Sequence, residues 1–273
     1  MAGIAWVNGR IVDADEPAIA VTDRGFMYGE GLFETMRAYG GRVFRLEQHL
    51  ARMLRGAEEL GLQEQARRLR SQEVTEALAA SDLSDAVVRL TLTANSLVIL
   101  VRPLSLPPPE RYVHGCIAIT TPAAVVQESP LRRLKSLNYL DKLLAQRAAE
   151  TAGAHEAILL DPDGCVIEAA RRNVFAVIGG RAITPPVSRG LLPGLTRAAV
   201  MEVAPRVGVG YEERDLTREE LLSAKECFLT SSIAEILPVA SVDGRTFRAA
   251  GPVTAALTQA YRDLVAEELN LSG

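Results

Sequence analysis

Apolar and polar side chains alternate in short runs along the N-terminal part of the chain, which predicts strands joined by tight turns. Asn8-Gly9 separates the first two runs, and this pair suits the two left-handed positions of a type I′ turn. After residue 45, apolar residues recur every three or four positions, which predicts a helix. The expected elements are strands at 5–7, 10–12, 31–39, 43–44, 87–93 and 97–102, a long helix over 46–60 and two shorter helices within 63–80.

The pattern changes beyond residue 120. Residues 122–130 show little periodicity and resemble a linker, and a helix is expected after Asn138, which would cap it. Its apolar face would carry Leu140, Leu143, Leu144 and Ala148. Further strands are expected at 117–121, 156–160, near 166 and 174 and at 227–229, with helices at 197–203 and 252–269. We therefore predict an α+β fold with a small domain at 1–120, a linker at 121–132 and a larger domain at 133–273.

Composition narrows the class of protein. The 273 residues carry a net charge of −4, which argues against a nucleic-acid partner because such partners require a basic surface. No signal peptide and no membrane-length apolar run is visible, so we expect a cytoplasmic protein. The three cysteines are far apart among apolar residues and are expected to be buried free thiols. The three histidines are too widely spaced to favour a metal site.

Lysine is scarce, which limits the candidates for chemistry that needs a primary amine. The chain has three lysines, at 135, 142 and 225. Lys135 lies between an apolar residue and a predicted helix start, where partial desolvation would free its amine for Schiff-base formation. In isolation a surface lysine beside two arginines is the simpler interpretation. Lys142 and Lys225 are expected to be solvated.

Two segments and two single residues could serve a phosphorylated cofactor. Gly194-Leu195-Thr196 precedes a predicted helix, whose N-terminal N–H groups favour phosphate, and Thr230-Ser231-Ser232 follows an apolar strand. Arg52 could balance the phosphate charge, and Glu168 at a strand end could pair with a pyridine nitrogen. Each also has an ordinary structural interpretation: a helix cap, a turn, a solvated arginine and an edge-strand charge.

Taken together and in order, these motifs resemble the class IV aminotransferases, the fold type IV pyridoxal-phosphate enzymes. The resemblance extends from about Trp6 to Gly244 and is collinear throughout. Its motifs are Tyr28–Arg37, Leu134–Leu140, Glu156–Asp161 with Gly164 and Glu168, Asn173–Phe175, Thr184–Pro186, Leu192–Arg197 and Glu235–Pro238. The implied fold has a small α/β N-terminal domain and a larger C-terminal domain with a barrel-like sheet, usually in a homodimer.

By that resemblance, Lys135 matches the Schiff-base lysine, Arg52 the phosphate-binding arginine, and Glu168 the partner of the pyridine nitrogen. Tyr139 matches a tyrosine that bonds the cofactor's phenolate oxygen. The cofactor implied is pyridoxal 5′-phosphate, acting on a small-molecule amine. The cofactor-binding residues expected are Arg52, Lys135, Tyr139, Glu168, Leu195, Thr196, Ser231 and Ser232, and the substrate-binding residues Tyr28, Phe33, Arg89 and Arg171.

Several reactions are possible within this family. The strand beginning at Arg89 lacks the later arginine and histidine of the D-amino-acid aminotransferases, and Thr35 stands where branched-chain enzymes usually have glycine. A threonine there is common in 4-amino-4-deoxychorismate lyases, so the sequence favours the lyase reaction, which gives p-aminobenzoate and pyruvate. Thr35 is then the candidate proton donor, although threonine is also a common strand residue. The alternative is an aminotransferase acting on branched-chain or D-amino acids with 2-oxoglutarate.

Two further points stay open in the sequence. Arg171 stands where the family commonly has a small residue, and it either binds a substrate carboxylate or points to solvent. A non-catalytic relative with the same fold is a third interpretation. It is opposed by the presence of Lys135, Arg52 and Glu168 at the three matching positions.

Overall fold

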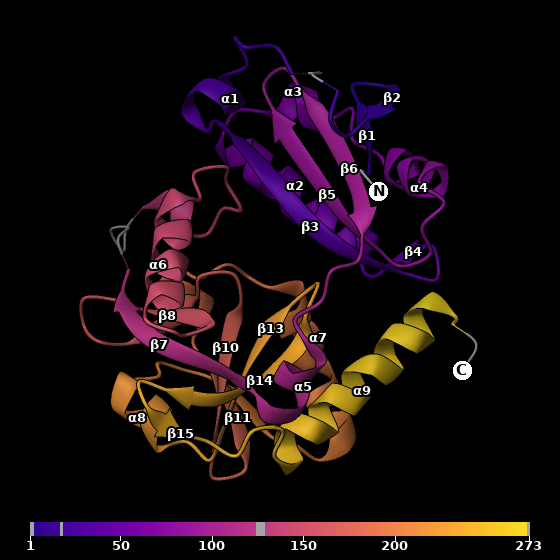
Figure 1. The fold of residues 1–273 in the computed structure, drawn as a ribbon. Coiled ribbons are helices and arrows are strands. Elements are labelled where there is room, and N and C mark those ends of the chain that lie inside the picture. The colour runs from indigo at the N-terminus through magenta and orange to yellow at the C-terminus, as the bar shows by residue number, and fades with distance from the viewer. Residues whose placement is uncertain (1–2, 17–18, 124–128, 272–273) are drawn as a thin grey trace. The chain divides into compact units, whose positions relative to one another are not determined.

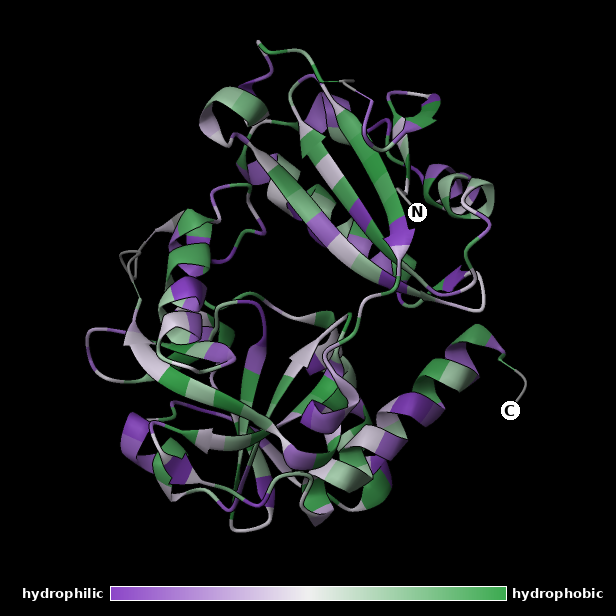
Figure 2. Ribbon diagram, in the orientation of Figure 1, coloured by the Kyte–Doolittle hydropathy of each residue, from purple (hydrophilic) through white to green (hydrophobic). Residues whose placement is uncertain are grey.

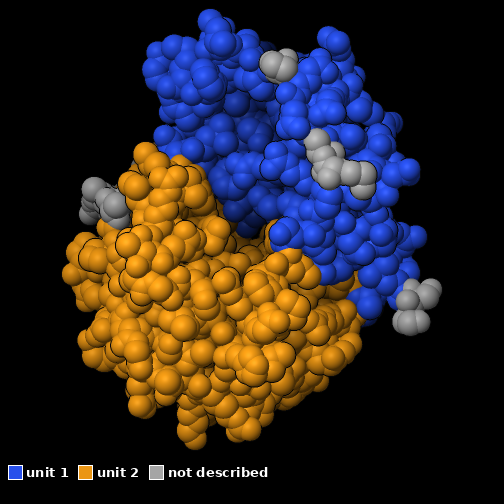
Figure 3. Space-filling model, viewed as in Figure 1, with its two compact units in different colours: residues 1–105, 134–138, 266–273 blue, residues 106–133, 139–265 orange. Residues whose placement is uncertain are grey.

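A computed structural model describes residues 3–16, 19–123 and 129–271 (Figure 1). The chain divides into two compact units, shown in blue and orange in Figure 3. Unit 1 comprises residues 1–105, 134–138 and 266–273, and unit 2 comprises residues 106–133 and 139–265.

Unit 1 contains an antiparallel six-stranded sheet in the order β2-β1-β6-β5-β3-β4. Its strands are β1 (Ile4–Val7), β2 (Arg10–Asp13), β3 (Gly31–Tyr39), β4 (Arg42–Val43), β5 (Ala86–Thr93) and β6 (Leu97–Pro103). Its helices are α1 (Arg24–Tyr28), α2 (Leu46–Glu59), α3 (Gln63–Ala66) and α4 (Ser71–Ala80). These elements confirm the expected pattern, and the β1–β2 turn places both Asn8 and Gly9 at positive φ as predicted.

The two faces of this sheet have different roles. Residues on one face, including Leu32, Met36 and Leu90, are buried in a core with α2, α3 and α4. The opposite face carries partly buried residues of β3, β5 and β6, because successive side chains alternate across a strand. Figure 2 shows this as apolar strands interrupted by hydrophilic positions.

Unit 2 contains a curled mixed sheet of nine strands, with the path β12-β11-β10-β13-β14-β7-β8-β9 and β15 on β14. The strands are β7 (Cys116–Pro122), β8 (Glu156–Leu160), β9 (Val166–Ala169), β10 (Asn173–Ile178), β11 (Arg181–Thr184), β12 (Tyr211–Glu213), β13 (Glu226–Ser231), β14 (Glu235–Val242) and β15 (Arg245–Thr246). The α-helices are α5 (Pro109–His114), α6 (Leu140–Thr151), α7 (Leu195–Val203), α8 (Arg218–Ser223) and α9 (Pro252–Leu269), whose last residues belong to unit 1. Short 3₁₀ turns occupy Pro130–Arg132, Val187–Arg189 and Ala204–Val207. The α+β prediction is confirmed.

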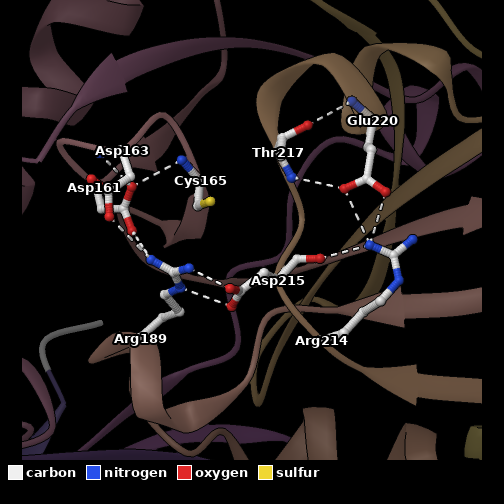
Figure 4. Close-up of polar contacts among 8 residues, drawn as sticks. All are labelled: Asp161, Asp163, Cys165, Arg189, Arg214, Asp215, Thr217 and Glu220. Atoms are coloured by element: carbon white, nitrogen blue, oxygen red, sulfur yellow. Dashed lines mark hydrogen bonds and ion pairs between the residues drawn. The ribbon is translucent and has the colours of Figure 1, made fainter.

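A polar network ties the loop before α7 to the turn between β8 and β9 (Figure 4). Arg189 donates from Nη1 to Asp161 Oδ2 at 2.9 Å and from Nε to Asp215 Oδ1 at 2.8 Å. Asp161 in turn accepts the backbone N–H of Cys165 at 2.9 Å. On the other side of the network, Thr217 and Glu220 form a capping box at the start of α8. These contacts set the path of the chain toward α7.

The apolar face expected for α6 is not the face that the helix buries. The helix packs on β7 and β8 through Lys142, Ala145, Gln146 and Ala149, and it exposes Leu140, Leu143 and Leu144. Asn138 does not cap it either: Tyr139 is the N-cap residue, and the Asn138 amide donates to the Gly29 carbonyl at 2.9 Å. The spacing of the leucines predicted the helix, but it did not determine whether the leucines pack against the core of this chain.

The compact units also differ from the domain limits expected from the sequence, 1–120 and 133–273 with a linker at 121–132. The first unit ends at Ser105, and residues 134–138 return to it. The helix α5 begins at Pro109, since proline is well placed in the first turn of a helix. Part of the expected linker, residues 124–128, lies outside the described residues. The cysteines are buried free thiols and Lys225 is exposed, both as predicted.

Candidate active site

Lys135 is held on the edge of β3 by its backbone. The carbonyl of Lys135 accepts the N–H of Phe33 at 2.8 Å, and the N–H of Leu137 donates to the carbonyl of Gly31 at 2.9 Å. Ser136 forms an isolated antiparallel bridge with Leu32. The segment 134–138 therefore extends the unit 1 sheet locally. This fixes the backbone position from which the Lys135 side chain extends. The Lys135 side chain is partly buried, as its sequence position suggested.

Two cations lie close to the ring of Phe33. The Nζ atom of Lys135 is 4.6 Å from the centre of the Phe33 ring, and the guanidinium carbon of Arg89 is 4.0 Å from it. In the β3–β5 register Arg89 faces Thr35, so these four side chains occupy one region of the same sheet face. The predicted residues Lys135, Phe33, Arg89 and Thr35 are brought together.

Directly behind this region, on the helix-covered face, is a buried charged cluster. Glu34 accepts hydrogen bonds from Arg52 Nε at 2.7 Å and Arg52 Nη2 at 2.6 Å, and its Oε2 lies 2.7 Å from His49 Nδ1. An ionised carboxylate only accepts, so His49 donates through Nδ1. Burial acts to raise the pKa of Glu34, but the Arg52 charge and the hydrogen bonds of His49 and Arg52 bring it down to about 2. Burial lowers the pKa of His49.

Sequence reasoning missed Glu34 and His49, and it named Arg52 only as a phosphate ligand. A usable signal was present, because Glu34 interrupts the core-facing positions Leu32, Met36 and Ala38. A carboxylate at such a position requires a charged partner. His49 and Arg52 are three residues apart on the neighbouring helix, which is the spacing that places two side chains on one face.

Tyr28, the remaining unit 1 candidate, is different. It ends α1 and is 60% exposed, with the Arg24 guanidinium 5.1 Å from its ring centre. Within unit 1 it is therefore a surface residue.

In unit 2, Glu168 is a buried carboxylate in β9 with a charged partner. It is 5% exposed, and its Oε1 accepts from Lys142 Nζ at 2.7 Å. Its Oε2 accepts the N–H of Leu192 at 3.3 Å. Lys142 was expected to be solvated, and that prediction was wrong because the buried face of α6 carries it.

Tyr139 lies beside this pair. Its hydroxyl donates to the Ala170 carbonyl at 2.8 Å, and Lys142 Nζ is 5.4 Å from its ring centre. Burial is the main cause that raises the pKa of Tyr139. Arg171, next to Ala170, is exposed. Of its two interpretations, unit 2 supports the solvent-facing one.

A chain of contacts leads from Glu168 to the start of α7. The carbonyl of Leu192 accepts from the Asn173 amide at 3.0 Å, and a Cβ on Gly194 would come within 1.9 Å of Asn173 Oδ1. A larger residue would displace the Asn173 side chain, so glycine at 194 lets the N-terminus of α7 lie close to β10. Thr230 is the cross-strand neighbour of Asn173, and its buried Oγ1 has no hydrogen-bond partner among the described residues.

These features suit a molecule with an aromatic nitrogen at one end and a phosphate at the other. The first N–H groups of α7, beginning with Leu195 and the buried Thr196, have no partner within the helix. The unpaired Thr230 hydroxyl is a further donor, and Ser231 and Ser232 follow it at the end of β13. Glu168 is a buried carboxylate of the kind that could pair with a protonated ring nitrogen. Within the described part of the chain, no group of three or more His, Cys, Asp or Glu could hold a metal ion.

Comparison with known proteins decides the family. A family model for class IV amino-transferases matches residues 31–242, most of the chain. This chain belongs to the class IV aminotransferases. The members of this family are pyridoxal-phosphate-dependent enzymes, as the sequence motifs implied, so pyridoxal 5′-phosphate is the cofactor.

Relatives of this class IV aminotransferase have several activities. It is 33% identical to a D-alanine aminotransferase of Bacillus licheniformis, covering 96% of both chains. It is 32% identical to a branched-chain-amino-acid aminotransferase of Pseudomonas aeruginosa, covering 96% of this chain and 93% of that one. An aminodeoxychorismate lyase of Bacillus subtilis is 29% identical, over 98% and 97% of the two chains.

Solved structures confirm fold type IV for this class IV aminotransferase. The branched-chain aminotransferase of Thermoproteus uzoniensis with norvaline has a TM-score of 0.88 and 32% identity, over 97% of this chain and 95% of that chain. The branched-chain amino acid aminotransferase of Escherichia coli has a TM-score of 0.88 and 29% identity, over 98% and 96% of the two chains. No described helix is long and apolar enough to cross a membrane.

Proposed function

We propose that this protein transfers an amino group between a small, mainly apolar α-amino acid and a 2-oxo acid. The observation that carries the proposal is the single sheet face on which the Lys135 amine and the Arg89 guanidinium both contact Phe33. Val98 and Leu100 of β6 share that face, opposite Thr91 and Arg89. An amine, a carboxylate-binding group and an apolar wall are what an α-amino acid with an apolar side chain requires. The branched-chain and D-alanine relatives support this substrate class.

The cofactor contacts follow the roles that the family motifs imply. We assign the phosphate to the N-terminus of α7 with Thr196, to Thr230, Ser231 and Ser232, and to Arg52, by hydrogen bonding and charge. Glu168 would accept a hydrogen bond from the protonated ring nitrogen, and Tyr139 would turn its hydroxyl from the Ala170 carbonyl to the phenolate oxygen. When bound, pyridoxal phosphate withdraws electrons from the substrate carbon that loses a proton.

Lys135 has two tasks in this proposal. Its amine would hold the cofactor covalently, and as a neutral amine it would move the proton at the substrate α-carbon. The backbone bonds to Phe33 and Gly31 keep the start of this side chain fixed, which favours a repeatable proton transfer. Arg89 would hold the substrate carboxylate through its planar guanidinium.

The first test is chemical labelling. The purified protein should be yellow, and borohydride reduction followed by peptide mapping should place the cofactor on Lys135. Lys225, an exposed lysine, serves as the internal control. A label on Lys142 or Lys225 would overturn the assignment of Lys135. A protein that takes up no cofactor would support a non-catalytic relative.

The second test is a product assay. Incubation of branched-chain amino acids and of D-alanine with 2-oxoglutarate should give glutamate and the matching 2-oxo acid. Formation of p-aminobenzoate and pyruvate from aminodeoxychorismate, without amino transfer, would overturn the proposal in favour of the lyase.

The lyase, which the sequence favoured, is the second candidate here because of Thr35. Its side chain shares the face of Phe33 and lies opposite Arg89 in the register, where a hydroxyl could protonate a departing oxygen. Thr35→Val keeps the shape and removes the hydroxyl. In the lyase it should reduce pyruvate release and leave the Lys135 label intact, whereas amino transfer should change little. Unchanged pyruvate release in a lyase-active protein would exclude Thr35 from the reaction.

We also infer that the protein forms a homodimer. The short helix α1 exposes Phe26 at 72% together with Met27 and Tyr28, and α6 exposes Leu140 at 62% together with Leu143 and Leu144. Apolar residues grouped on helix surfaces favour an interface. Light scattering with size-exclusion chromatography should give twice the chain mass, and Leu144→Asp should shift the protein toward monomer. A monomer at micromolar concentration would contradict the inference.

A further inference from the structure

The helix α6 buries a lysine where an apolar residue would be expected. Lys142 begins the buried stripe that continues through Ala145, Gln146 and Ala149, while neighbouring leucines face outward. The Lys142 side chain is only 16% exposed. Placing an ammonium on the buried face of a helix is costly unless a specific partner compensates it.

That partner is Glu168. Nζ lies 2.7 Å from Oε1, a charge-assisted distance, and both groups are mostly shielded from water. Although burial alone would lower the pKa of Lys142, the charge of Glu168 and its hydrogen bond outweigh this effect and the pKa is raised. Lys142 is therefore a cation at neutral pH.

The geometry of Glu168 leaves room for a third donor. Lys142 occupies Oε1, and the Leu192 N–H approaches Oε2 at the longer distance of 3.3 Å. A carboxylate offers about four lone-pair sites on its two oxygens, so two donors do not saturate it. The backbone of β9 and the side chain of Lys142 together limit how the carboxyl group can rotate.

We propose that Lys142 is a positioning residue for Glu168: its ammonium holds Oε1 and balances the buried charge, so that the carboxylate keeps one orientation toward the cofactor's ring nitrogen. This inference rests on the proposed role of Glu168 in cofactor binding. Lys142 itself touches neither substrate nor reacting atoms in this proposal. It acts through Glu168.

The test measures binding and the spectrum of the cofactor. Lys142→Met removes the ammonium and keeps an unbranched side chain, Lys142→Arg keeps the charge, and Lys225→Met is the control at an exposed lysine. Affinity for pyridoxal phosphate is measured by fluorescence quenching on cofactor-depleted protein, with folding checked by circular dichroism. Lys142→Met should bind about tenfold more weakly, the size expected for a lost bond to a charged group. Lys142→Arg should recover most of the affinity, and Lys225→Met should match the parent.

A double variant separates positioning from a structural effect. If Lys142 acts through Glu168, then Lys142→Met added to Glu168→Gln should weaken binding no further than Glu168→Gln alone. The visible absorption band of Lys142→Met should also move toward that of Glu168→Gln. Should Lys142→Met fail to fold, Lys142→Gln, which keeps a donor without the charge, takes its place.

The outcomes distinguish this inference from the proposed function. If borohydride labels Lys135 in the parent but Lys142→Met has the parent's affinity and spectrum, this inference alone is overturned. Additive losses in the double variant overturn it as well. If the parent takes up no cofactor at all, the proposed function fails, and this inference fails with it.

Discussion

The guanidinium of Arg52 donates two hydrogen bonds to the Glu34 carboxylate, from Nε to Oε1 at 2.7 Å and from Nη2 to Oε2 at 2.6 Å. Both side chains are at most 9% exposed, and His49 completes the cluster. Glu34 alternates along β3 with Phe33 and Thr35, so the cluster supports the sheet from behind the candidate substrate face. The charges of this cluster therefore affect both the stability of the fold and the electrostatic potential at the candidate active site.

Glu34→Gln should reduce the sensitivity of the protein to acid. The folded-state pKa of Glu34, about 2, lies below its unfolded value of 4.5. Its ionisation therefore stabilises the fold above about pH 4.5, and this contribution is lost as the pH falls toward about 2. Urea titrations between pH 7 and pH 3 should show a smaller loss of unfolding free energy for Glu34→Gln than for the parent.

His49 also makes the fold less stable as the pH falls. Its pKa is lowered from 6.5 by burial, so the unfolded chain binds protons first and stability falls as the pH drops below 6.5. His49→Gln should remove this part of the pH dependence.

Equal slopes of unfolding free energy against pH for Glu34→Gln and the parent below pH 4.5 would contradict the Glu34 assignment.

The phosphate role of Arg52 can be separated from its role in the cluster. Arg52→Ala alone leaves a buried carboxylate without its guanidinium and should destabilise the fold by about 3–5 kcal/mol. Arg52→Met is therefore introduced into Glu34→Gln, so that its removal leaves no buried carboxylate unpaired. Its affinity for pyridoxal phosphate should fall about tenfold to a hundredfold relative to Glu34→Gln.

Pyridoxal without phosphate is the matched ligand for this experiment. Its binding should change little on loss of Arg52, because the contact removed is to the phosphate. Equal losses for both ligands, or no loss for either, would exclude Arg52 as a phosphate ligand.

Glu168→Gln leaves the Lys142 ammonium without its carboxylate and should lose stability. It should still fold and bind the cofactor but lose most turnover, because a neutral ring withdraws electrons less strongly. Steady-state amino transfer at saturating cofactor is the measurement. Glu150→Gln, on an exposed position of α6, is the control and should retain parental activity. Near-parental turnover of Glu168→Gln would contradict its role.

Thr217→Ala should cost about 1 kcal/mol of stability because it removes the N-cap hydroxyl of α8, which accepts the Glu220 N–H at 3.2 Å. The Arg189 contacts to Asp161 and Asp215 in the same network stay in place. Thr217→Ser, which keeps the hydroxyl, should remain close to the parent in urea denaturation. Equal stability of all three proteins would show that the cap contributes nothing.

Local patterns in the sequence determined most of the elements and the chemical class of the site. Asn8-Gly9 predicted the first turn, alternation predicted β3, β5 and β6, and α9 spans the predicted residues 252–269. The motif around Lys135 and its collinear partners predicted the family and the cofactor, which the comparisons confirmed. These features depend on neighbours within a few positions, or on a fixed order of motifs, and both are visible in one chain.

Tertiary structure alone decided what each helix face and each charge meets. Periodicity places Lys142 opposite the leucines of α6, but only packing on β8 shows that the lysine is buried against Glu168. Likewise, the pairing of Glu34 with Arg52 joins residues 18 positions apart in the chain. The free energy of a buried charge depends on which partner the fold places beside it. Residue spacing along the sequence does not give the distance between the two groups in the folded chain.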